Sequence, residues 1–360
     1  MIEDSGHDLE AADIVSSCSV WFPERLTYIL SNLSTLFPSL HTLGIRFPDT
    51  SLDFPDSFGS MLYGESEIEE DSDYHVLIKL LNLTFDAVAE NGAKENTGIE
   101  PQGSGDNEMP FQQRIMHFSI SQYPPFGCDA LLSPRFGTFL SNIISFSLEI
   151  DQSYNLDEGA YGNEILQAFL RETIPESFLS HFYGGTALQN LRFQALSSCC
   201  FGVTDSLCLK PQLLGSLKKL VLENIVLSYQ NTIRDTSGLG AFIKSNSSTL
   251  EVVELNNAGW VVESFEPDSV DHWGSFWVFL REHQPVNLRR LKINEHFIDR
   301  DLQKPHAKSP ESFKFHYETL DYGWGYMGWN EDNEGIPEFR RDEDLKSWNL
   351  LRKSVLAQQE

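Results

Sequence analysis

Apolar residues recur along this chain with the spacing of a short repeated strand. The clearest copy places Leu217, Leu220 and Leu222 in the pattern L-x-x-L-x-L. Alternate residues of a strand point to the same side, so Leu220 and Leu222 enter one core, and Leu217 joins them from the preceding turn. One such strand cannot bury its apolar face alone. The pattern therefore predicts further copies stacked on either side.

Six more copies of this triplet are present, with the spacing known from leucine-rich repeats. They are Leu40/Leu43/Ile45, Ile115/Phe118/Ile120, Ile143/Phe146/Leu148, Leu188/Leu191/Phe193, Leu250/Val253/Leu255 and Leu288/Leu291/Ile293. Successive copies begin 75, 28, 45, 29, 33 and 38 residues apart, whereas regular repeats are about 20–29 residues long. Position nine, the asparagine of regular repeats, is Ile225, Ala258 and His296 in the last three copies. We therefore expect a degenerate array that lacks the asparagine ladder.

Helical periodicity lies between the triplets. The strongest example is a run of apolar residues at i, i+3, i+4 and i+7 over 273–280. Further helices are expected over 22–37, 74–90, around 165–170, over 239–243, and over 339–358. Alternating strands and helices predict parallel strands joined by right-handed crossovers. The expected fold is an α/β, irregular leucine-rich-repeat solenoid, a horseshoe with strands on the concave face and helices outside.

Two of these helices have a defined apolar face in the sequence. For 74–90 the expected buried stripe is Val76, Leu80, Leu83 and Ala87, with Leu77 and Leu81 beside it. For 339–358 it is Phe339, Leu345, Trp348, Leu351 and Val355.

The composition along the chain predicts its domain organisation. Residues 1–20 are expected to be a disordered start, and 21–320 a repeat domain interrupted by an acidic, flexible insertion over 48–110. Within that insertion, ESEIEEDSD (65–73) holds six carboxylates in nine residues, and 91–110 is expected to be flexible. Alternation of Phe313, Phe315 and Tyr317 predicts a final strand that closes the array. Residues 321–360 are expected to be the C-terminal cap.

The irregular copies LGSLKKLVLENI, STLEVVELNNAGW and VNLRRLKINEHFI, with long helical linkers between copies, resemble the leucine-rich-repeat region of fungal-type F-box proteins over most of 22–298. The stretch FPERLTYILSNL (22–33) is similar to an F-box opening, although the first repeat follows it directly. The resemblance implies a substrate receptor of a cullin-based ubiquitin ligase that contacts the ligase adaptor. Two alternatives stay open: a scaffold with no ligase link, and an enzyme on a non-repeat α/β fold.

The third, fifth and seventh positions of each copy point out of the core, onto the concave face. In the last four copies these positions, our candidate protein-binding residues, are Asn190, Arg192, Gln194, Lys219, Val221, Glu223, Val252, Glu254, Asn256, Arg290, Lys292 and Asn294. In the earlier copies they are mostly small and polar. The basic residues either keep an exposed face soluble, or bind an acidic or phosphorylated protein segment through charge-assisted hydrogen bonds.

The charge balance argues against two classes of partner. With 26 basic and 53 acidic residues the formal net charge is −27, which repels nucleic-acid phosphates and anionic membranes. Five scattered cysteines without C-x-x-C spacing predict reduced, mostly buried thiols. No signal peptide and no apolar run long enough to span a membrane is visible. We expect an intracellular protein of the cytoplasm or nucleus.

Motifs for catalysis and cofactor binding were also considered. Gly323-x-Gly325-x-x-Gly328 matches the dinucleotide fingerprint, but acidic residues follow it where a helix should begin, so we interpret it as a glycine–aromatic packing loop. The ten histidines include no H-E-x-x-H pair, and His272, before the helix at 273–280, is expected to be solvated or to cap it. We expect a non-enzymatic protein without cofactor or metal.

Overall fold

The structure is a computed structural model. It describes residues 24–47, 73–97, 115–151, 168–183, 187–195, 209, 214–227, 238–262, 272–283, 287–294, 296–299, 317–321, 326–329 and 338–357. The segments expected to be the disordered start (1–20) and most of the acidic insertion lie outside these residues.

A single large sheet holds all seven predicted strands. Its eight strands, in spatial order, are β1 (Thr42–Arg46), β2 (His117–Tyr123), β3 (Ser145–Ile150), β4 (Asn190–Ala195), β5 (Lys219–Glu223), β7 (Val252–Asn256), β9 (Arg290–Ile293) and β10 (His296–Asp299). In this order, every pair of adjacent strands from β1 to β9 is parallel. The residues of the triplets are buried, except that Leu40 and Ile45 of the first copy, at the edge of the sheet, are half-buried. The predicted register of the seven triplets is confirmed.

The end of the array differs from the prediction. The sheet ends on β10, which runs antiparallel to β9. The strand expected at 313–317 is described only from Tyr317, and it belongs to a second sheet. This sheet has the order β12-β11-β8-β6, with β6 (Val226–Leu227), β8 (Gly259–Val262), β11 (Tyr317–Asp321) and β12 (Tyr326–Trp329). The prediction of a closing strand in the main sheet is wrong, because β11 pairs with β8 instead.

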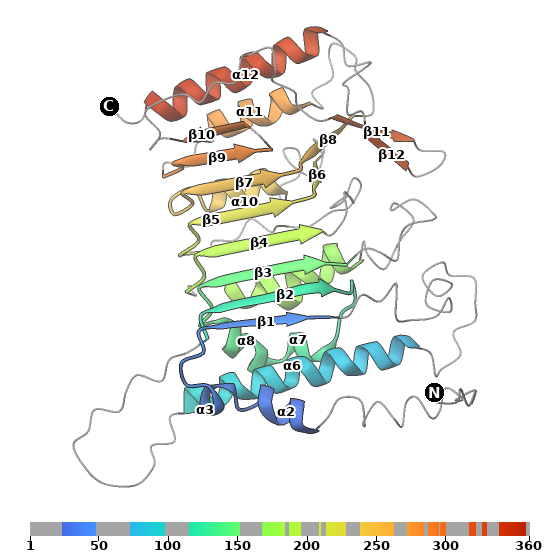
Figure 1. Cartoon of the computed structure of the whole chain (residues 1–360). Coiled ribbons are helices and arrows are strands. Elements are labelled where there is room, and N and C mark those ends of the chain that lie inside the picture. The colour runs from blue at the N-terminus through green and yellow to red at the C-terminus, as the bar shows by residue number, and fades with distance from the viewer. Residues whose placement is uncertain are drawn as a thin grey trace, which may run out of the picture.

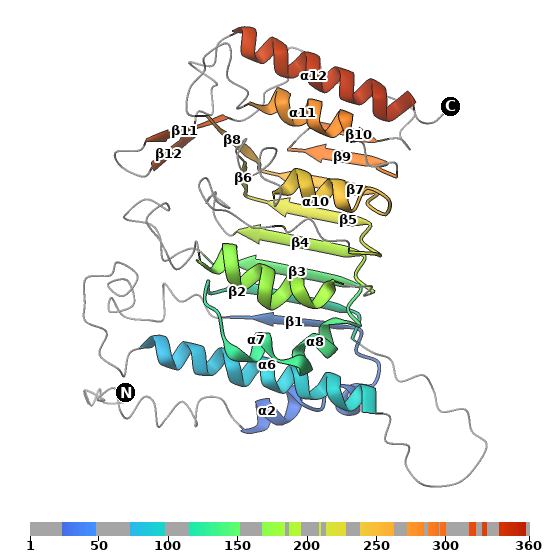
Figure 2. The ribbon, with the colours of Figure 1, turned by 180° about the vertical axis from the view of Figure 1, so that it is seen from behind.

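The helices form a layer on one side of the main sheet. They are α2 (Glu24–Leu30), α3 (Leu33–Leu36), α6 (Asp73–Thr97), α7 (Asp129–Leu132), α8 (Pro134–Leu140), the π-helix η2 (Phe169–Phe178), the 3-10 helix η3 (Leu179–Phe182), α10 (Leu239–Ser245), α11 (Trp273–Glu282) and α12 (Glu338–Ala357). Figure 1 looks onto the bare strands, and Figure 2, from behind, looks onto the helices. α6 lies at the β1 end and α12 at the β9 end.

The core between sheet and helices is phenylalanine-rich at one end and tryptophan-rich at the other. Phe146 of β3 packs against Phe178 of η2, with ring centroids 5.6 Å apart. Trp273 and Trp277 of α11 stack with centroids 5.1 Å apart, and Trp348 of α12 packs on Trp277 at 5.0 Å. These large aromatic side chains supply much of the buried apolar area between the sheet and the helices.

Two predicted helices near the N-terminus have different limits. The helix expected over 22–37 is divided into α2 and α3. The helix expected to end at 90 continues to Thr97, so the start of the predicted flexible segment 91–110 is helical. Gly92 explains this extension in part, because a Cβ there would lie 2.7 Å from Cβ of Phe139, and only glycine lets α6 approach α8 so closely.

The buried faces of α6 and α12 also differ from the expected stripes. In α6 the buried face is centred on Leu77, Leu81, Thr84, Phe85 and Val88, whereas Leu80 and Leu83 are half-buried. In α12 the buried residues are Arg340, Asp344, Trp348, Leu351 and Val355, whereas Phe339 is exposed and Leu345 half-buried. The helical phase chosen for α12 was wrong at its first two turns, where charged residues occupy the inner positions.

Cys128, the one cysteine within the described residues, is buried and has a free thiol. Burial raises the pKa of this thiol to about 12. The thiol therefore stays protonated at neutral pH, as the prediction of a reduced, buried cysteine requires for this residue. The remaining four cysteines lie outside the described residues.

Candidate protein-binding face

The open face of the main sheet brings the predicted binding residues together. Cross-strand register places Asn190, Lys219, Val252 and Arg290 in one row, Arg192, Val221, Glu254 and Lys292 in a second, and Gln194, Glu223 and Asn256 in a third. None of the described helices covers this side of the sheet (Figure 1). Eleven of the twelve candidates therefore lie on one side of the sheet, which we call the open face, although Val221 is buried there among its neighbours.

Asn294, the twelfth candidate, does not belong to these rows. It follows β9 in the left-handed conformation, with φ of 52°. Its side chain accepts a hydrogen bond from the Ala258 N–H (2.7 Å) and donates one to the Ala258 carbonyl (3.0 Å). The Asn294 amide thus joins two neighbouring turns of the chain, and its role in partner binding stays a prediction.

The open face changes character along the sheet. At the β1 end its residues are mostly small and polar, for example Gly44, Ser119 and Ser147, which lie side by side in register. At the β9 end they are long and charged. A bulky or extended ligand can approach the backbone closely at the first end, whereas the second end offers charged groups that reach into solvent.

The charged residues of the open face contact one another. Arg192 Nη2 lies 2.6 Å from Glu223 Oε2 and also donates to Gln194 at 2.7 Å. Glu254 Oε1 lies 3.2 Å from Lys219 Nζ and 3.9 Å from Arg290 Nε. Most of these side chains are partly exposed, so each pair contributes about 0–1 kcal/mol to stability. The pairs hold the basic groups in place more than they stabilise the fold.

Asparagine side chains line the turns that follow the strands, contrary to the expectation of no asparagine ladder. Asn224, Asn257 and Asn294 all have positive φ, which asparagine tolerates better than most residues. Asn257 donates to Asn224 Oδ1 at 2.8 Å, and Asn224 donates to the Ala195 carbonyl. The ladder was missed because these asparagines lie one or two positions before position nine.

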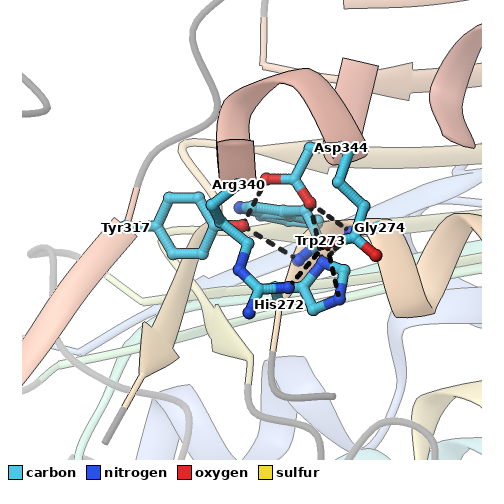
Figure 3. A network of polar contacts seen from close by, with 7 residues as sticks. His272, Trp273, Gly274, Tyr317, Arg340 and Asp344 are labelled. Carbon is cyan, nitrogen blue, oxygen red and sulfur yellow. Dashed lines mark hydrogen bonds and ion pairs between the residues drawn. The ribbon is translucent and has the colours of Figure 1, made fainter. Parts of the chain in front are cut away.

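A buried polar network joins the C-terminal helix to the rest of the fold (Figure 3). Asp344 of α12 accepts hydrogen bonds from the Gly274 N–H (2.6 Å) and from the Tyr317 hydroxyl, and its Oδ1 lies 2.8 Å from His272 Nδ1. The Trp273 N–H donates to the Tyr317 hydroxyl at 3.2 Å. Burial, the nearby Asp344 charge and the hydrogen bond to it raise the pKa of Tyr317.

This network caps the N-terminus of α11 from other parts of the chain. The first N–H groups of a helix have no intrahelical acceptor, and here Asp344 and Tyr317 supply two acceptors. His272 is the N-cap residue, as one of its two predicted roles required, although it is buried. Asp344 is 0% exposed. Its position indicates a structural role, in which α12 is fixed against α11.

The structure describes only part of the glycine-rich stretch at 321–335. Residues 326–329 of the glycine-rich stretch form β12, antiparallel to β11, and not the loop we expected. Among the residues the structure describes, no group of three potential metal ligands occurs. In the same residues, none of the helices has the length and hydropathy needed to cross a membrane.

Fold and site together define a mixed α/β protein built on a seven-strand parallel sheet, with helices on one face and polar rows on the other. In comparisons with known proteins, no family model, no curated protein and no solved structure matches the chain.

Proposed function

We propose that this protein is an interaction module whose open face binds an extended segment of a partner protein. The observation that carries the proposal is the set of three polar rows, which cross four or more parallel strands on a side that no described helix covers. Parallel sheets usually have both faces covered. A sheet face that none of the described helices covers supports a role in recognition.

We infer further that the repeating unit is a degenerate leucine-rich repeat. Support comes from seven triplets in one parallel register and from asparagines at successive turns. In such arrays each unit contacts mainly its neighbours, and the strand face forms an extended surface for ligands. The expected binding surface of this fold is the open face.

The ligase role, a substrate receptor joined to a cullin through an adaptor, is supported by the apolar surface of α2. In the stretch similar to an F-box opening, Leu26 is 39% exposed, Tyr28 61% and Ile29 38%. Exposed apolar side chains on one short helix are typical of protein contacts. α2 lies at the β1 end of the molecule, away from the basic end of the open face (Figure 1), so an adaptor and a substrate would not compete.

A bulky charge in the middle of the open face tests partner recognition. Ser147→Arg places a long side chain between Ser119 and Arg192, and we expect at least about a tenfold loss of partner capture, because the side chain occupies the surface that the partner segment crosses. The matched control is Thr138→Arg, at an exposed position of α8 in the helix layer. Quantitative affinity purification with parent and variants measures the effect. Equal losses from both substitutions would contradict the proposal.

The ligase role is tested on α2. Leu26→Lys with Ile29→Lys should remove co-purifying adaptor and cullin, because two charges replace an apolar contact, while the melting temperature changes little at these exposed positions. Leu132→Lys, an exposed apolar residue of α7, serves as control and should retain the adaptor. A parent protein that captures its partner through the open face but brings down no adaptor or cullin would favour the scaffold alternative.

A further inference from the structure

Two basic side chains contact one carboxylate on the open face, and a third basic residue lies opposite it on the next strand. Lys219 and Arg290 contact Glu254 from β5 and β9, and Lys292 is the cross-strand partner of Glu254. The side chains of Lys219 and Arg290 are 38% and 45% exposed, whereas that of Glu254 is 12% exposed. The carboxylate therefore lies at the base of the group, and the cations extend into solvent. We call Lys219, Arg290 and Lys292 the basic trio.

The charges of this group do not balance. Among the residues that the structure describes, these three positive groups and their one carboxylate leave a formal charge of +2. The adjacent Arg192–Glu223 pair is balanced by itself. A local excess of two positive charges stands out in a chain with a formal net charge of −27. Within a screening distance of about 8 Å these cations repel one another, so an anion that carries two charges would be complementary.

The row that contains Lys219 and Arg290 leaves a place for such an anion. Val252 lies between Lys219 and Arg290 in register. Its short apolar side chain is partly exposed and offers no competing charge between the two cations. A carboxylate brings one charge and two oxygens, whereas a phosphoryl group brings a charge of about −1.5 to −2 and three acceptor oxygens, one for each member of the trio.

We propose that the basic trio binds a phosphorylated serine or threonine of the partner segment. This inference rests on the proposed function, because the phosphorylated residue belongs to the segment that crosses the open face. Arginine and lysine donate charge-assisted hydrogen bonds to phosphate oxygens. Glu254 holds the cations close together before the ligand arrives, which lowers the cost of ordering them on binding.

An array of short peptides tests the proposal with the full-length protein. Each sequence is presented in three forms, with serine, phosphoserine or glutamate at its centre. Among the phosphoserine peptides that the protein binds, we expect each to bind about tenfold more tightly than the same peptide with serine or glutamate at its centre. Arg290→Ala with Lys292→Ala should abolish this preference. Lys218→Ala with Arg289→Ala removes the same charge from exposed residues just before β5 and β9, and should change affinity by about twofold or less, because long-range attraction is screened.

The outcomes separate this inference from the proposed function. Peptides that bind without preference for phosphoserine, and whose binding Ser147→Arg abolishes, would overturn the phosphate site and leave recognition by the open face intact. Equal loss of the preference in both double variants would also overturn it, because net charge alone would then explain binding. If neither phosphorylated nor unmodified peptides bind, both proposals fail. Melting temperatures of the two double variants near the parent value verify that each is folded.

Discussion

Leu220→Asp is expected to unfold the protein. Leu220 is 0% exposed in β5, a central strand of the main sheet. An aspartate there would place a charge among apolar side chains with no partner, and the lost packing adds to this desolvation cost. We expect the free energy of unfolding to fall by about 4 kcal/mol or more. Urea denaturation followed by circular dichroism measures the loss, and poor soluble expression would agree with it.

The matched control for this substitution lies on the opposite side of the sheet. Asn190→Asp on β4 introduces the same carboxylate on the open face, where Lys219 is its cross-strand neighbour. The free energy of unfolding should change by about 0.5 kcal/mol or less. If Leu220→Asp and Asn190→Asp unfolded at the same urea concentration, Leu220 could not be part of the core.

Asp344→Ala is expected to destabilise the C-terminal end of the molecule. The substitution removes the buried acceptor of the Tyr317 hydroxyl and one of the two acceptors of the Gly274 N–H, which keeps His272 Nδ1 at 3.0 Å. A buried donor left without its acceptor costs about 1–3 kcal/mol, and the packing around the lost carboxylate adds to this, so we expect a total loss of about 2–4 kcal/mol. Tryptophan fluorescence is a suitable probe, because Trp348 of α12 packs on Trp277 of α11.

Asp342→Ala provides the comparison on the same helix. Asp342 is exposed, and its removal should change the free energy of unfolding by about 0.5 kcal/mol or less. Tyr317→Phe removes a single hydroxyl from the network and should lie between the two, at about 1–2 kcal/mol. If Asp344→Ala were as stable as Asp342→Ala, the capping role of Asp344 would be wrong.

The local sequence determines much of the main sheet. The triplets predicted all seven parallel strands, because alternate apolar residues in a short strand can be buried in only one way. The same alternation placed Arg192, Glu254 and Lys292 on the opposite side, where the structure has them. The helix at 273–280 was predicted for a similar reason, since its apolar period matches that of a helix.

The ends and edges of the molecule depended on contacts that are distant in sequence. Asp344 points inward because it accepts hydrogen bonds from Gly274 and Tyr317, which lie 70 and 27 residues away in the sequence. From sequence alone, a carboxylate is expected at the surface, because charged residues are rarely buried without a partner. In the same way, β11 pairs with β8 across more than 50 residues, and no period within either strand specifies that partner.

By itself, the sequence determined which residues of the repeats face inward, because burial of apolar side chains at a spacing of two or of 3.6 is a local property. Only the tertiary structure decided that asparagines bridge successive turns, that Asp344 of α12 caps α11, and that basic residues of β5 and β9 contact one carboxylate of β7. Polar contacts of this kind depend on the direction and distance between groups from separate elements, which are fixed only when the core has packed.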